Sequence, residues 1–85
     1  MTTNFSILII DGLAIESVYV RELTSESEYD LSDVDQVVDF VAYFLGLENS
    51  TLIIEKYSRF ARYASINYED TYGVKEIILT WENFQ

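Results

Sequence analysis

The chain has 85 residues, and its 15 acidic and 5 basic side chains give a formal net charge of −10 at pH 7. Hydrophobic residues make up 49% of it, including seven Tyr and five Phe, which excludes a disordered acidic tail. Cysteine and histidine are absent, so disulfides, thiolate catalysis, cysteine zinc sites and histidine bases are excluded. A chain this short predicts one domain, residues 1–85.

The location expected from the sequence is the cytoplasm. The N-terminus, Met1 to Asn4, has neither the basic region nor the small-residue cleavage site of a secretory signal. The longest apolar runs, residues 7–10 and 40–45, are too short to span a bilayer. Anionic membranes repel an acidic surface. We therefore expect a soluble intracellular protein without membrane contact.

The first part of the chain predicts a β-hairpin. Residues 5–10 form a β-branched run that stops at the turn dipeptide Asp11-Gly12. Residues 16–23 alternate in the manner of a strand, and a loop of several residues is expected between the two strands. Residues 24–30 are polar and acidic, which is typical of an exposed loop.

A helix is expected from Ser32 to Leu45. Ser32 is a candidate N-cap, Gly46 is a natural C-terminal stop, and acidic residues in the first turn suit the helix dipole. Apolar residues recur at helical spacing and form one stripe, widened by Phe40, Phe44 and Leu47: Val34, Val37, Val38, Val41 and Leu45.

The segment from residue 49 to 64 is ambiguous. Apolar residues at helical spacing favour a second helix, although residues 51–54 alone would suit a strand. Strands are predicted at 65–70 and 74–81, on either side of a turn at 71–73. The predicted fold class is α+β, with an antiparallel sheet of about four strands and one or two helices on one face.

The sequence contains no recognisable catalytic or metal-binding motif. Gly12, Gly46 and Gly73 are the only glycines, and none fits a phosphate-binding loop. Asp33, Asp35 and Asp39 resemble the beginning of a calcium loop, but the required glycine and closing glutamate are missing. We therefore expect a protein that is not an enzyme and that uses no cofactor or metal.

Basic residues cluster in one place. Lys56, Arg59 and Arg62 are spaced to follow one side of a helix, with aromatic neighbours that could stack on bases. A molecule of this net charge repels the phosphate backbone, so direct nucleic-acid binding is not expected. Pairing with the protein's own carboxylates, such as Glu55 or the acids of the first helix, is the simpler expectation, and contact with a partner's acidic rim stays open.

The acidic stretch carries the functional prediction. Nine acids and no base lie between Glu22 and Glu55. Acids at a regular spacing, with tyrosines between them, could occupy a basic groove in place of phosphates. The candidate partner-binding residues are Glu26, Glu28, Tyr29, Asp30, Asp33, Asp35 and Asp39, with a second patch at Glu69, Asp70 and Tyr72.

These features predict a small acidic inhibitor that mimics the charge of nucleic acid and binds a basic nuclease or other nucleic-acid-binding protein. Phage-encoded inhibitors of CRISPR effectors, restriction enzymes or repair enzymes form this physical class, by analogy of size and composition alone. Two alternatives stay open. One is an immunity protein or antitoxin for a basic toxin. The other is a structural or oligomeric module, and a homodimer would also enlarge so small a core.

Overall fold

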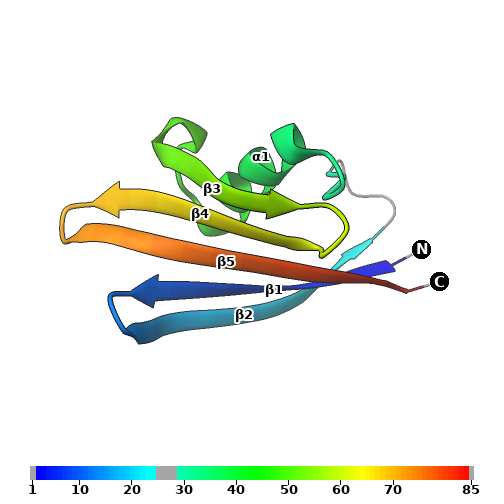
Figure 1. Ribbon diagram of the computed structural model, residues 1–85, viewed down its shortest axis with the longest axis horizontal. Helices are drawn as coiled ribbons and strands as arrows, with labels where there is room; N and C mark the ends of the chain where they lie inside the picture. Colours follow the sequence, from blue (N-terminus) through cyan, green and yellow to red (C-terminus); the bar gives the residue numbers. More distant parts are fainter. Residues whose placement is uncertain (1, 25–28, 85) are drawn as a thin grey trace.

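The computed structural model describes residues 2–24 and 29–84, and in them one helix packs on a five-stranded antiparallel sheet (Figure 1). The strand order is β2-β1-β5-β4-β3. The predicted α+β class is confirmed, with five strands where about four were expected. In chain order the elements are β1 (Thr2–Asp11), β2 (Ala14–Thr24), α1 (Val34–Leu45), the 3-10 turn η1 (Asn49–Thr51), β3 (Leu52–Ser58), β4 (Tyr63–Asp70) and β5 (Gly73–Phe84).

The hairpin of β1 and β2 is tighter than the sequence indicated. Asp11 pairs directly with Ala14, so only Gly12 and Leu13 connect the strands. Gly12 has a φ of 64°, a left-handed conformation that glycine adopts without strain and that reverses the chain in two residues. The predicted loop of several residues is therefore wrong. A shift in register between Ile9 and Ile10 absorbs the extra length of β2.

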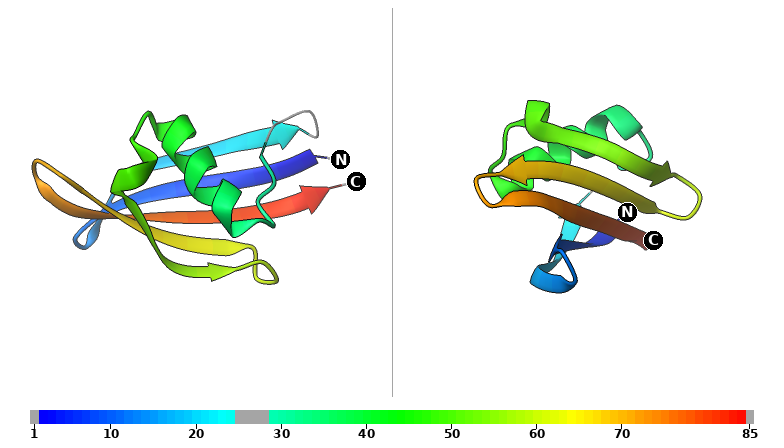
Figure 2. Two further views of the ribbon diagram at one scale, coloured as in Figure 1. Left: turned by 90° about the horizontal axis from the view of Figure 1, so that it is seen from above. Right: turned by 60° about the vertical axis from the view of Figure 1, so that its left-hand side comes forward.

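The sheet buries one of its faces. Phe5, Ile7 and Ile9 are at most 7% exposed, and they alternate with residues that point to the opposite face. Opposite Ile7 and Ile9, strand β5 places Leu79 and Ile77, both fully buried. Figure 2 shows α1 crossing this face of the sheet, while the other face carries no element of the described chain.

The N-cap of helix α1 lies one residue later than expected. Asp33 is the N-cap, because its side chain accepts a hydrogen bond from the backbone N–H of Asp35. Ser32, the predicted cap, instead donates its hydroxyl to Asp30. Gly46 ends the helix as predicted, at a φ of 70°. The ring of Phe40 meets the sheet edge-on, 4.9 Å from the ring of Phe5 between centroids.

The predicted second helix over residues 49–64 is wrong. After the 3-10 turn, residues 52–58 form the edge strand β3, and residues 59–62 turn the chain into β4. β-branched residues such as Ile53 and Ile54 favour a strand, and pairing with β4 satisfies the backbone of β3 on one side. The strands predicted at 65–70 and 74–81 are confirmed and extend further. The element order is therefore ββαβββ.

Candidate protein-binding surface

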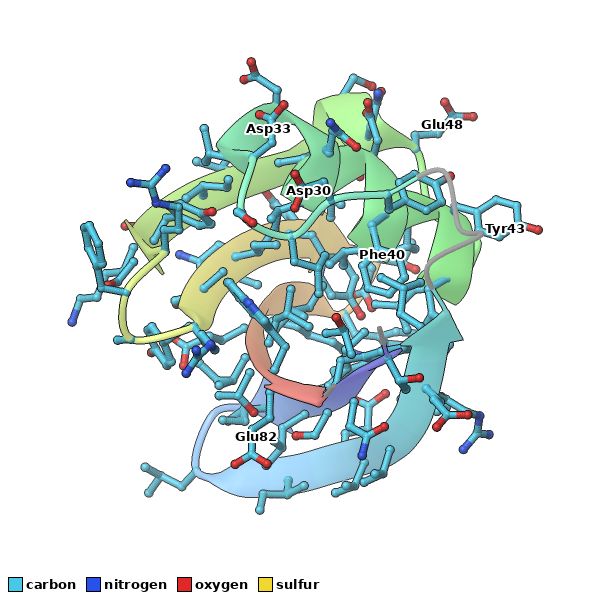
Figure 3. All side chains as sticks on the ribbon, turned by 90° about the vertical axis from the view of Figure 1, so that its right-hand side faces the viewer. Asp30, Asp33, Phe40, Tyr43, Glu48 and Glu82 are labelled. Atoms are coloured by element: carbon cyan, nitrogen blue, oxygen red, sulfur yellow. The ribbon has the colours of Figure 1, made fainter. Side chains whose placement is uncertain are left out.

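The helix side of the molecule carries the densest negative charge. Asp35 and Asp39 are exposed on the outer side of α1, and Glu48 is exposed just after it. Figure 3 shows Asp30, Asp33 and Glu48 on the helix side, with Glu82 on the other side of the sheet. We call Asp30, Asp33, Asp35, Asp39 and Glu48 the acidic helix surface.

Two of these carboxylates are tied to their own backbone. Asp30 Oδ1 accepts hydrogen bonds from the backbone N–H of Ser32 at 3.0 Å and from its hydroxyl at 2.7 Å. The hydroxyl bond, followed by the backbone bond, lowers the pKa of Asp30 below its ordinary 3.8. Asp33 accepts from the backbone N–H of Asp35 and, at 3.1 Å, from the side chain of Gln36. Asp30 and Asp33 therefore order the entry to α1.

Asp35 and Asp39 present carboxylates on the helix that a partner could reach. Within residues 2–24 and 29–84 the Asp35 side chain makes no hydrogen bond or ion pair. Asp39 uses one oxygen, which accepts from Asn49 Nδ2 at 2.9 Å. The two residues lie one helical turn apart, roughly 6 Å. They present two negative charges in line on a rigid element.

Two tyrosines lie beside the acidic helix surface, one half-buried and one exposed. Tyr29 is half-buried, with its ring 5.4 Å from that of Phe40 and 6.1 Å from that of Tyr43. Its ring therefore packs against α1. Tyr43, which the sequence analysis did not single out, is 77% exposed and points outward in Figure 3. Its position one turn after Asp39, on the polar side of the helix, is the sequence feature that could have predicted this exposure. Glu26 and Glu28 lie outside the described residues.

The second predicted patch is partly neutralised by a lysine. Glu69, Asp70 and Tyr72 lie at the β4–β5 turn, at the end of the long axis opposite to the chain termini (Figure 1). Lys75 Nζ lies 3.1 Å from Asp70 and 2.8 Å from Glu16. A backbone hydrogen bond from Tyr72 and, less strongly, Lys75 lower the pKa of Asp70. Glu69 lines a shallow pocket with Thr51, whose backbone N–H donates to the carbonyl of Glu48.

The basic cluster lies on a hairpin instead of a helix. Lys56 is on β3, and Arg59 and Arg62 belong to the turn that follows. In the described parts of the chain none of the three forms an ion pair, so the expected pairing with Glu55 or the acids of the first helix is not seen. The guanidinium of Arg59 lies 5.1 Å from the ring centroid of Phe60, a side chain that is 86% exposed.

Residues 2–24 and 29–84 contain neither a metal-binding cluster nor a membrane-spanning helix. No three acidic side chains there are grouped in a way that would hold a metal ion. The 12-residue α1 is too short to cross a bilayer, and no other helix in this part of the chain is long and apolar enough. The chemistry that the surface does offer is a set of unneutralised carboxylates for a cationic partner.

The chain matches no protein-family model, no curated protein and no solved structure. Its function is therefore argued from its own residues. Three of these residues are exposed and form no ion pair within the described residues: Asp35 and Asp39 on α1, and Glu48 just after it.

Proposed function

We propose that the protein is a small cytoplasmic inhibitor that occupies the nucleic-acid site of a basic protein with its acidic helix surface. A nuclease of a CRISPR, restriction or repair system is the class of target that fits a competitor of this size and charge. The observation that carries the proposal is the exposure of Asp35 and Asp39, one turn apart and without an ion pair among the described residues.

The physical argument is electrostatic. A base-free stretch from Glu22 to Glu55 contributes nine of the 15 acids. Asp30, Asp33 and Glu48 lie on the helix side in Figure 3, and Asp35 and Asp39 belong to α1 itself. A concentrated negative surface steers a positively charged partner and binds it in a salt-sensitive way. Because α1 is anchored on the sheet through Phe40, its carboxylates are pre-positioned and little order is lost on binding.

The hydrogen bonds divide the acidic residues into two groups for an experiment. Asp30 and Asp33 hold the loop and the helix cap, so their replacement would mix folding with binding. Asp35, Asp39 and Glu48 can be neutralised with less risk, by the triple variant Asp35→Asn, Asp39→Asn and Glu48→Gln. A matched control, Asp11→Asn, Glu76→Gln and Glu82→Gln, removes the same charge at the β1–β2 turn and on strand β5.

The test has two stages. The tagged protein is first used to capture partners from a lysate of its native host at low and high salt, with mass spectrometry as the readout. Affinity for the captured protein is then measured for both triple variants. We expect a basic nucleic-acid-handling protein, released at high salt, and at least tenfold weaker binding by the helix variant than by the control. Equal weakening by both variants would overturn the proposal. So would a failure of nucleic acid to displace the protein from the captured partner.

A further inference from the structure

The face of the sheet opposite α1 is exposed and apolar. Alternation along β1 places Leu8 and Ile10 on this face, because Ile7 and Ile9 point to the core. Leu8 pairs across the strands with Val18 and Ile78. With their neighbours these residues form a contiguous apolar patch over β2, β1 and β5: Leu8, Ile10, Ile15, Val18, Val20 and Ile78.

The exposure of this patch is large for so small a protein. Ile15, Val18 and Val20 are 60%, 57% and 64% exposed. Ser6 and Thr80, which lie beside Val20 and Leu8, are 3.3 Å apart and hydrogen-bond to each other. One hydroxyl therefore donates to the other, and only one hydroxyl hydrogen needs a further acceptor when the face is covered. A contiguous apolar patch of this kind marks an interaction site.

We propose that two copies of the chain pack these patches face to face and form a two-fold symmetric dimer with its helices outermost. The distribution of charge favours a second copy. The patch contains no charged side chain, whereas the acidic helix surface lies on the opposite layer. Packed sheets lie about 10 Å apart. Their outer helices are then separated by more than the Debye length of about 8 Å, so their mutual repulsion is screened.

The interface would take in most of the outer face of the sheet. A stable interface buries about 800 Å² on each partner, and the whole molecule measures 40 × 24 × 22 Å. Glu22, Glu76 and Glu82 border the patch on the same face. In the dimer these glutamates would lie near their symmetry mates, so salt should strengthen self-association. Binding of a basic partner by the acidic helix surface should respond in the opposite direction.

The test is sedimentation velocity over a wide range of protein concentration, on the protein alone. We expect a species of twice 9.9 kDa. The dissociation constant of this dimer should fall at higher salt. The near-isosteric double variant Val18→Thr, Val20→Thr should weaken the dimer at least tenfold. Val34→Thr, the same change at a partly exposed position of α1, serves as the control and should leave the dimer unchanged. Circular dichroism checks that each variant is folded, and Val20→Thr alone replaces the double variant if that one unfolds.

A further variant distinguishes packing of faces from pairing of edges. β2 is an edge strand, and two copies could also join along it. Ile78 is on the interior strand β5, so Ile78→Thr should weaken a face-to-face dimer and spare an edge-to-edge one. A dimer that survives Ile78→Thr, a chain that stays monomeric at every concentration, or an assembly larger than two copies would each overturn the proposal. These outcomes leave the inhibitor proposal intact, because the helix variant that tests it changes no residue of the patch or its border.

Discussion

The hydroxyl of Tyr57 donates a hydrogen bond of 2.8 Å to the backbone carbonyl of Leu31. This bond joins the edge strand β3 to the segment that leads into α1, 26 residues away. The ring of Tyr57 also stacks on Trp81, with centroids 6.2 Å apart. Burial is the main cause that raises the pKa of Tyr57, so the phenol stays protonated and can donate. The entry to the acidic helix is thus positioned by a strand.

Removing this hydroxyl should loosen the helix entry without disturbing the core. We expect Tyr57→Phe to lower the free energy of unfolding by about 1 kcal/mol, because the Leu31 carbonyl loses its partner while the aromatic ring stays. Urea denaturation followed by circular dichroism measures the change. Tyr63→Phe is the matched control, since no hydrogen bond of the Tyr63 hydroxyl is seen in the described chain. Equal effects of the two variants would contradict the role of this bond.

Adjacent residues of β3 should respond very differently to truncation. Leu52 is 7% exposed and Ile53 is 63% exposed, as expected for side chains on opposite faces of a strand. Leu52→Ala should therefore cost about 2–5 kcal/mol, whereas Ile53→Ala should change stability by less than about 1 kcal/mol. Thermal or urea unfolding measures both. A helix over residues 49–64 would instead have buried Ile53. A larger loss of stability for Ile53→Ala than for Leu52→Ala would therefore refute the strand.

The end of α1 depends on a glycine. Gly46 has a φ of 70°, and its N–H bonds back to the carbonyls of Ala42 and Tyr43. An added Cβ would meet no atom within 4 Å, so the cost of substitution is backbone strain alone. Gly46→Ala should destabilise the protein by about 1 kcal/mol, and Gly46→Asn by less, because asparagine tolerates the left-handed conformation better. Equal unfolding midpoints for the two variants would argue against this cap.

Stability in acid should depend on Asp30. Its pKa is lowered by the hydrogen bonds from Ser32, so the native state holds the carboxylate charged more firmly than the unfolded chain does. This contribution is complete above the ordinary pKa of 3.8 and is lost as the pH falls through the lower native value. Asp30→Asn should be less stable at neutral pH and should lose less stability on acidification below 3.8.

Urea unfolding at a series of pH values tests this dependence. Asp35→Asn removes the same charge from a carboxylate without a hydrogen bond in the described residues, and it serves as the control. It breaks no bond and loses only the interaction of its charge with the N-terminus of α1, so it should reduce stability at neutral pH by less than about 1 kcal/mol. The two variants should therefore diverge above pH 3.8 and converge below it. Parallel curves would show that Asp30 contributes only its charge.

The elements with a strong local signal could be predicted from the sequence. Val37, Phe40 and Val41 recur at helical spacing, and all three are buried under α1. Gly46 marks the end of the helix, and the alternation of Ile77, Leu79 and Trp81 marks a strand. Among the candidate site residues, exposure of Asp35 and Asp39 follows from their place on the polar side of that helix. Composition also determined the net charge, and with it the class of partner that we propose.

Only the tertiary structure decided the rest. Residues 52–58 carry apolar residues compatible with either a helix or a strand, and pairing of Ile54 with Ile66 on β4 determined the outcome. The same pairing created a fifth strand. The exposure of Val18 and Val20 likewise depends on which face α1 covers. The physical reason is that local patterns determine conformation and charge, whereas contacts between segments distant in the sequence determine which surfaces remain open.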